Sequence, residues 1–191
     1  PDYITSKEIL DKIIEKGADV IEIGMPFSDP MADGPTIQLA SKRAIDNGTN
    51  LETIFEICNH IREKNFSTPI VLMGYYNVIL HYGIKNFVDK INSIGVDGLI
   101  IVDLQPEEDQ ELYDNLKSKN IDLIRLITPN TNSKRLSTIT NQASGFLYYV
   151  TITGITGQKS ANIQELKKII PNIRKYSKLP IIAGFGIKDK N

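Results

Sequence analysis

The sequence predicts an α/β fold of the (β/α)8 TIM-barrel type, built from parallel strands that alternate with helices. Short apolar runs rich in β-branched residues recur along the chain, and an amphipathic helical segment separates each run from the next. This alternation is equally compatible with a doubly wound open sheet. The barrel is favoured because no G-x-G-x-x-G follows the first run, and because polar or glycine-rich segments follow several runs rather than one.

Six strands are expected, because both faces of each run are largely apolar, as in parallel strands covered on two sides. The runs are Asp19–Gly24, Ile70–Gly74, Gly98–Asp103, Leu123–Thr128, Phe146–Thr151 and Ile181–Gly184. An eight-stranded barrel takes about 250 residues, whereas the chain has 191. We therefore expect about six of eight strands in one partial barrel domain over residues 1–191. One strand is expected to be missing before the first helix and one after the last run.

The segments between the runs have the apolar periodicity of helices. The first helix is predicted over Ser6–Lys16, with Ser6 as its N-cap and Gly17 as its C-terminal stop. Pro106 is expected at the first position of another helix, where the acidic residues that follow it complement the helix dipole. The other predicted helices are Leu51–Lys64, Ile84–Ile94, Pro106–Ser118, Ser133–Thr140 and Ile163–Tyr176.

The composition excludes several classes of function. The formal net charge of −1 gives no electrostatic reason to bind nucleic acid or an acidic membrane surface. The single cysteine, Cys58, cannot form an internal disulfide, which suits a reducing compartment, so we expect a cytoplasmic protein. No apolar run approaches the roughly 18 to 20 residues that span a bilayer.

Glu22 is a carboxylate in a strand whose side chains should be apolar. Strand alternation places Val20, Glu22 and Gly24 on one face and two isoleucines on the other. The isoleucines suit the helix-covered exterior, so Glu22 is expected to point into the barrel near the carboxyl end of its strand, where catalytic side chains collect. An unpaired buried carboxylate is costly, which favours a catalytic role. The alternative is a structural glutamate paired with a lysine or arginine.

The segment after this strand, residues 25–36, contains three prolines and two aspartates, which is typical of a shaped loop. Asp33 lies near its end. On spacing alone, Asp33 is either a second functional carboxylate or the cap of a helix that begins around Pro35.

The string IEIGMPFSDPMADGPTIQ, residues 21–38, resembles the signature of tryptophan synthase α subunits and meets every fixed position of it. The similarity continues through LMGYYN, VDGLIIVDL, PN, GITG and GFGI. It implies a (β/α)8-barrel lyase of tryptophan biosynthesis that cleaves indole-3-glycerol phosphate into indole and glyceraldehyde 3-phosphate by a retro-aldol reaction.

This resemblance implies distinct roles for the two carboxylates. Glu22 would be the general acid–base that protonates indole C3 and assists deprotonation of the glycerol hydroxyl. Asp33 would bind the indole N–H as positive charge grows there. Protonated indole is itself the electron sink, so no Schiff-base lysine, metal or other cofactor is expected in this subunit. No lysine lies in a predicted strand, and neither do His60 and His81, the latter expected in a connecting segment.

Further substrate contacts are implied by the same resemblance. Tyr148 matches an active-site tyrosine near Glu22, with a core-filling aromatic as the alternative. The positions that match the indole pocket are also explicable as barrel core: Met73, Tyr75, Ile100, Val102 and Leu126. In the glycine-rich phosphate loops, Gly157, Phe185 and Gly186 match contacts to the phosphate or glycerol region. Thr156 matches a threonine that bonds the loop carrying Asp33 when the site closes.

The expected partner is a pyridoxal-phosphate-dependent β subunit in an α2β2 assembly. Pro26 and Asp29 match positions at that contact, and Asp103 matches one that helps to signal between subunits. Gln105 departs from the family, because many relatives carry proline there, and so does Ile152, where several carry a polar residue or valine.

Two other functions remain open. Another phosphate-binding barrel enzyme, such as an isomerase or indole-glycerol-phosphate synthase, would share the fold. A non-catalytic binding or allosteric module is the second, because two missing strands would leave open sheet edges. For the same reason, residues 1–191 alone are expected to be weakly stable and nearly inactive.

Overall fold

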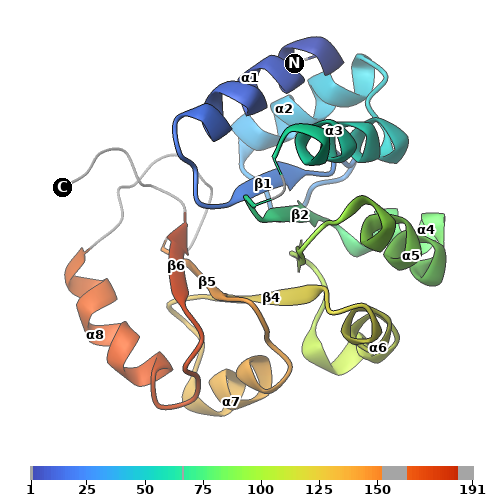
Figure 1. Ribbon diagram of the computed structural model, residues 1–191. Helices are drawn as coiled ribbons and strands as arrows, with labels where there is room; N and C mark the ends of the chain where they lie inside the picture. Colours follow the sequence, from blue (N-terminus) through green and yellow to red (C-terminus); the bar gives the residue numbers. More distant parts are fainter. Residues whose placement is uncertain (1, 66, 152–162, 185–191) are drawn as a thin grey trace.

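The computed structural model describes residues 2–65, 67–151 and 163–184. Within these ranges six strands form one parallel sheet in the order β1-β2-β3-β4-β5-β6. Every strand therefore pairs with its neighbours in sequence, whereas a doubly wound sheet would reverse its order at a switch point. Figure 1 shows the strands following an arc with most helices outside it. The barrel prediction is confirmed and the open-sheet alternative is wrong.

The strands lie within about two residues of the predicted runs, because buried β-branched runs leave little freedom in where a strand can start. The largest differences are at the first strand, which begins two residues after the predicted Asp19, and at the third strand, which ends two residues before the predicted Asp103. The observed strands are β1 (Ile21–Gly24), β2 (Ile70–Gly74), β3 (Gly98–Ile101), β4 (Asp122–Ile127), β5 (Leu147–Val150) and β6 (Ile181–Gly184).

At least one helix lies between each pair of consecutive strands in the chain. The helices of the described ranges are α1 (Tyr3–Glu15), α2 (Pro35–Asp46), α3 (Leu51–Lys64), α4 (Tyr76–Tyr82), α5 (Ile84–Ile94), α6 (Gln110–Ser118), α7 (Ser133–Asn141) and α8 (Ile163–Ile173). A 3-10 turn, η1 (Pro106–Glu108), precedes α6.

The predicted N-cap of the first helix is wrong. Helix α1 begins at Tyr3, because the carboxylate of Asp2 accepts a hydrogen bond from the amide of Thr5 at 2.9 Å. The hydroxyl of Ser6 donates instead to the carbonyl of Asp2. Gly17 ends the helix as predicted, with a φ of +84° that favours glycine.

Three other helices differ from the prediction, of which α8 simply ends at Ile173 rather than at the predicted Tyr176. Helix α4 is only seven residues long, too short for a clear apolar periodicity, and it places His81 inside a helix rather than in a connecting segment. The single helix predicted over Pro106–Ser118 is divided at Asp109, whose side chain is fully buried against Arg125. The helix is interrupted at Asp109, because its carboxylate forms an ion pair with the buried Arg125.

The sheet has two apolar faces. The convex face packs on the outer helices through the main core cluster, which includes Ile21, Leu72 and Leu99. The concave face carries a second cluster, which contains Val71, Ile100, Ile124, Phe146 and Tyr148. The strand residues that face the barrel interior are therefore those on the same side of the sheet as Val71 and Ile100.

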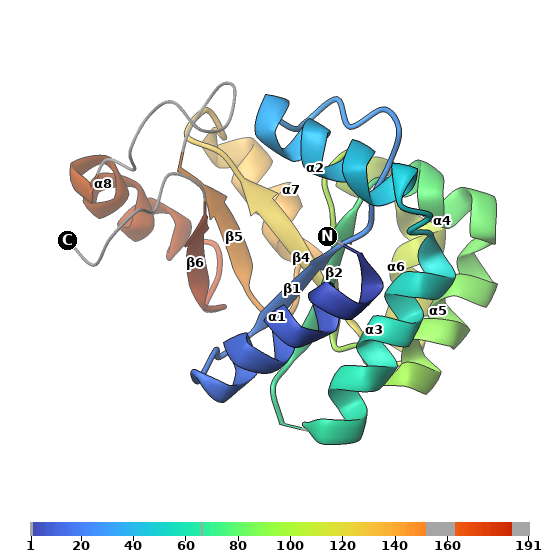
Figure 2. The same ribbon diagram turned by 90° about the horizontal axis from the view of Figure 1, so that it is seen from above.

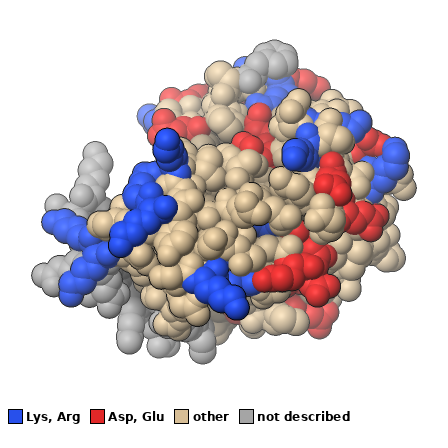
Figure 3. Space-filling model, turned by 90° about the horizontal axis from the view of Figure 1, so that it is seen from below, with Lys and Arg blue, Asp and Glu red and all other residues tan. Residues whose placement is uncertain are grey.

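The loop after β1 leads to α2, which lies beyond the ring of outer helices (Figure 2). On the face of the molecule shown in Figure 3, Lys and Arg gather toward the side of α8, and Asp and Glu gather on the opposite side. In the part of the chain that the structure describes, no helix combines the length and hydropathy needed to cross a membrane.

Candidate active site

Glu22 lies on the concave face, as the alternation predicted. It pairs in register with Val71 of the inner cluster, while Ile21 and Ile23 on either side of it are buried on the convex face. The expectation of a buried carboxylate is wrong for the described residues, because the Glu22 side chain is exposed on the open concave face. Partial loss of solvent there still raises the pKa of the Glu22 carboxyl. Among the described residues no lysine or arginine forms an ion pair with Glu22. The alternative of a structural, charge-paired glutamate therefore has no support.

Tyr148, on a different strand, has a pKa that is affected by the charge on Glu22. It is buried in the inner cluster, on β5, across the barrel from β1. Burial, and then the charge on Glu22, raise the pKa of its hydroxyl to about 12. The phenol is therefore neutral at physiological pH. Its hydroxyl lies directly over Gly184 of β6, where a Cβ would overlap the phenol.

Asp33 is held by a tyrosine from another strand. The hydroxyl of Tyr75 donates a hydrogen bond to Asp33 Oδ2 at 2.9 Å and accepts one from the amide of Ala32 at 3.0 Å. Burial, and then the bond to Asp33, raise the pKa of Tyr75 well above its usual range, so its proton is retained. The Tyr75 ring also packs on Phe27, with 5.3 Å between ring centroids.

The interpretation of Asp33 as a helix cap is wrong. The N-cap of α2 is Gly34, and no side chain caps that helix. The carbonyl of Asp33, not its carboxylate, accepts a hydrogen bond from the side chain of Gln38 at 2.9 Å. The carboxylate is thus free of the helix and is oriented by Tyr75.

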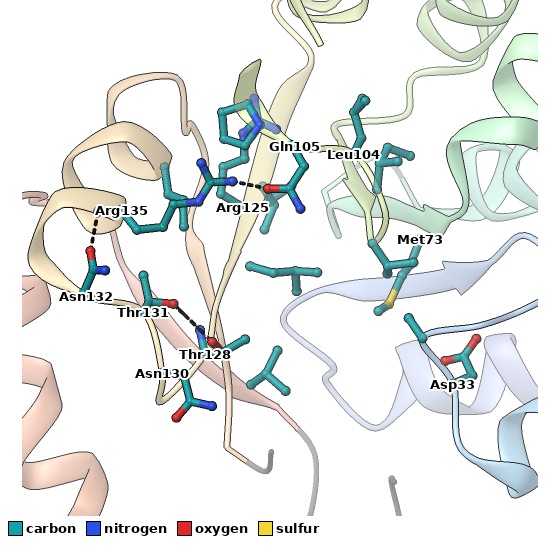
Figure 4. A pocket seen from close by; sticks show the side chains of 18 residues that line it. Asp33, Met73, Leu104, Gln105, Arg125, Thr128, Asn130, Thr131, Asn132 and Arg135 are labelled. Carbon is teal, nitrogen blue, oxygen red and sulfur yellow. Dashed lines mark hydrogen bonds between the residues drawn. The ribbon is translucent and has the colours of Figure 1, made fainter. Parts of the chain in front are cut away.

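Glu22 and Asp33 both line one cavity of about 440 Å³, together with Pro26, Met73 and Tyr75. Much of the remaining wall of this cavity comes from helices α1, α2 and α3. A second cavity of about 720 Å³ continues on the other side of Asp33 and Met73 toward Thr128, Asn130 and Arg135. Figure 4 shows Asp33 and Met73 facing this second space, with the β4–α7 loop on its far side. Asp33 therefore lines both cavities, as Met73 and Val102 also do.

The indole-pocket residues predicted by resemblance divide into two groups. Met73, Val102 and Leu126 line the cavities, and Tyr75 lines the one that contains Glu22. Ile100 is fully buried in the inner cluster and is not among the described residues that line either cavity, so it supports the pocket from beneath. Thr156, Gly157, Phe185, Gly186 and Ile152 lie outside the described residues.

The three residues predicted at a partner contact lie on loops at the carboxyl ends of the strands. Pro26 is half-buried beside Glu22, and Asp29 is exposed and accepts a hydrogen bond from Ser28. Asp103 is exposed, and its Oδ1 accepts a hydrogen bond from the amide of Tyr76 at 2.8 Å.

Sequence reasoning missed two arginines that hold the β3–α6 segment. Arg125, on β4, pairs with the buried Asp109, and Arg135, on α7, bonds both Gln105 and Glu107. The bond from Arg135 to Gln105 is visible in Figure 4. An arginine in the middle of an otherwise apolar strand was the available signal, because a buried guanidinium requires a partner.

A carboxylate of raised pKa beside a second, hydrogen-bonded carboxylate is suited to moving a proton next to a developing positive charge. On a barrel, with both groups at the carboxyl ends of the strands, this arrangement is that of an acid–base enzyme.

The comparisons with known proteins specify which one. The family model of the tryptophan synthase alpha chain matches residues 1–191. The tryptophan synthase α subunit of Legionella pneumophila is 36% identical with a TM-score of 0.86, over 96% of this chain and 67% of that one. A chain from the tryptophan synthase α2β2 complex of Pyrococcus furiosus is 35% identical with a TM-score of 0.88, over 98% and 75%. Tryptophan synthase of Mycobacterium tuberculosis gives 30% identity and a TM-score of 0.88, over 96% and 69%. The chain belongs to the tryptophan synthase alpha chain family, and its role is that of an α subunit in tryptophan biosynthesis.

Proposed function

We propose that Glu22 and Asp33 together catalyse the cleavage of indole-3-glycerol phosphate into indole and glyceraldehyde 3-phosphate. The observation that carries this proposal is Glu22, which has a raised pKa, no cationic partner among the described residues and a cavity shared with Asp33. A raised pKa favours the protonated form of the Glu22 carboxyl, which is the form that can donate a proton and then take one back.

The chemistry follows from these properties. The Glu22 carboxylic acid protonates C3 of the indole ring, which becomes an indoleninium with its positive charge on the N–H. Asp33, held by Tyr75, accepts a hydrogen bond from that N–H and stabilises the charge. The Glu22 carboxylate then takes the proton of the glycerol hydroxyl, the carbon–carbon bond breaks, and its electrons return to the ring. Neutral indole and an aldehyde result, so no cofactor in this subunit is needed for the proton and electron balance.

Glu22→Gln tests this role, because the amide has nearly the same shape and cannot transfer the proton. We expect kcat for release of glyceraldehyde 3-phosphate to fall by about 10² to 10⁴-fold with little change in KM. Glu56→Gln, an exposed position on α3, is the matched control and should leave both constants unchanged. Substantial activity in Glu22→Gln would show that another group transfers the proton.

We also propose a β subunit as partner, in an α2β2 assembly, with Pro26, Asp29 and Asp103 at the contact. The α2β2 complex of the Pyrococcus furiosus relative supports this assembly. Pyridoxal phosphate would be bound by that β subunit, and the site of action would be the cytoplasm. Measuring the same cleavage with and without β subunit tests the partnership, because a productive contact should raise the rate. The assay also separates this lyase from a non-catalytic module or another phosphate-binding barrel, neither of which would form indole.

A further inference from the structure

The start of helix α4 is fixed by a residue from a different strand. Tyr75 is the N-cap of α4, with an extended backbone at φ −109° and ψ 145°, and its own side chain does not cap the helix. The first helical amide, that of Tyr76, donates instead to Asp103 Oδ1 at 2.8 Å. Asp103 follows β3, so the beginning of α4 is tied to the loop after the neighbouring strand.

The side chain of Tyr75 leaves this fixed point in the direction of the β1–α2 loop. It contacts that loop at three places: the ring of Phe27, the amide of Ala32 and the carboxylate of Asp33. Tyr75 is 3% exposed, so its ring has little room to change rotamer independently of its backbone. The position of the Tyr75 hydroxyl therefore depends on the position of the α4 N-terminus.

These contacts form one continuous connection. Asp103 holds the Tyr76 amide, the adjacent residue Tyr75 carries the phenol, and the phenol orients Asp33. We propose that Asp103 is a positioning residue for Asp33, acting through the Tyr75–Tyr76 segment rather than on the substrate. This proposal rests on the catalytic role proposed above for Asp33.

Removal of the Asp103 acceptor frees the Tyr76 amide and lets the start of α4, with Tyr75, shift away from Asp33. Asp103→Ala should therefore lower kcat for cleavage by about three- to tenfold, the range expected for one lost cap. KM should change little, because Asp33 acts on charge that develops after binding.

Two further variants separate the acceptor from the charge. Asp103→Asn keeps an acceptor oxygen in place and should lose clearly less activity than Asp103→Ala. Asp103→Glu keeps the charge but moves it by one methylene, and should lose activity as Asp103→Ala does. If Asp103→Ala does not fold, the activities of Asp103→Asn and Asp103→Glu are compared instead. Equal activity of these two variants overturns the proposal.

A double-mutant cycle with Tyr75→Phe tests the route. If Asp103 acts through Tyr75, the double variant is no slower than Tyr75→Phe alone. Additive losses would overturn the proposal, as they would mean that Asp103 acts by another path. Asp2→Ala is the matched control, because Asp2 caps α1 through the same kind of bond, 2.9 Å long. It should affect stability but not kcat, and it should not couple to Tyr75→Phe.

Amide exchange gives a readout that needs no activity. In the complex with a β subunit, Asp103→Ala should speed exchange at both Tyr76 and Ala32, whereas Asp103→Asn should not. Unchanged exchange at Ala32 overturns the positioning route. If the exchange results hold but Asp33→Asn is fully active, the route is correct and the proposed role of Asp33 is wrong.

Discussion

At the scale of single residues, Gly184 is placed where the barrel interior has no space for a side chain. A Cβ on this β6 residue would overlap the hydroxyl and ring of Tyr148. The glycine is therefore required by the phenol that lies against it, because packed interiors tolerate little added volume.

Gly184→Ala should force the Tyr148 ring to move and destabilise the protein by about 1–3 kcal/mol, the usual cost of overpacking a core. Adding Tyr148→Leu should restore much of that stability, because the shorter side chain leaves room for the methyl group. Urea unfolding of the two variants measures both effects. Gly24→Ala on the same concave face is the control, since a Cβ there meets no described atom within 4 Å. An unchanged midpoint in Gly184→Ala would contradict the argument.

Individual site residues were predictable from sequence to different degrees. Glu22 follows from strand alternation alone, because a two-residue period needs only local information. The catalytic interpretation of Asp33 depended on the family resemblance, and its contact with Tyr75 joins residues 42 positions apart. No local pattern encodes such a contact, so Tyr75 was expected only as an apolar pocket residue and not as the group that orients Asp33.

At the scale of elements, the strands were predicted well and the helix ends less so. Buried β-branched runs specify each strand within about two residues. A helix end is decided by which of several polar residues caps it, and at α1 Asp2 occurs before the expected Ser6. Helix α4 was missed because its start is set by Asp103, from a separate part of the chain.

The junction between η1 and α6 depends on one buried ion pair. Asp109 is fully buried and pairs with Arg125, which is 5% exposed. Asp109→Ala should destabilise the protein by about 3–5 kcal/mol, because it leaves the guanidinium buried without a counter-charge. Equilibrium unfolding in guanidinium chloride at neutral pH measures this loss of stability.

Two comparisons control the Asp109 prediction. Glu107→Ala removes the neighbouring, more exposed pair with Arg135 and should cost no more than about 1 kcal/mol. Replacing Asp109 with Leu and Arg125 with Met together should be much less harmful than Asp109→Ala, because no charge is then left buried. A small loss in Asp109→Ala would mean that water reaches Arg125.

At the scale of the whole molecule, the described sheet has two open edges. Among the described strands β1 pairs only with β2, and β6 only with β5. Helix α1 also exposes apolar side chains, with Ile9 at 46% and Ile13 at 41%. Unpaired edges and exposed apolar surface both favour association over a stable monomer.

This chain, without a β subunit, should therefore unfold at low denaturant concentration, bind an apolar dye and cleave substrate poorly. Equilibrium unfolding followed by both circular dichroism and fluorescence measures this. The α subunit of Legionella pneumophila, of which the matched region covers 67%, is a suitable longer comparison. A single cooperative transition together with normal turnover would contradict the expectation.

The sequential strand order also sets the order in which the site is completed while the protein is made. A chain leaving the ribosome folds from its N-terminal end, and here each new strand finds its neighbour already outside the tunnel. Glu22, Asp33, Tyr75 and Asp103 are all available once β3 has emerged. Tyr148 and Gly184 arrive with the last described strands. The two carboxylates and the residues that hold Asp33 thus leave the ribosome before the phenol of Tyr148, which emerges near the end of the described chain.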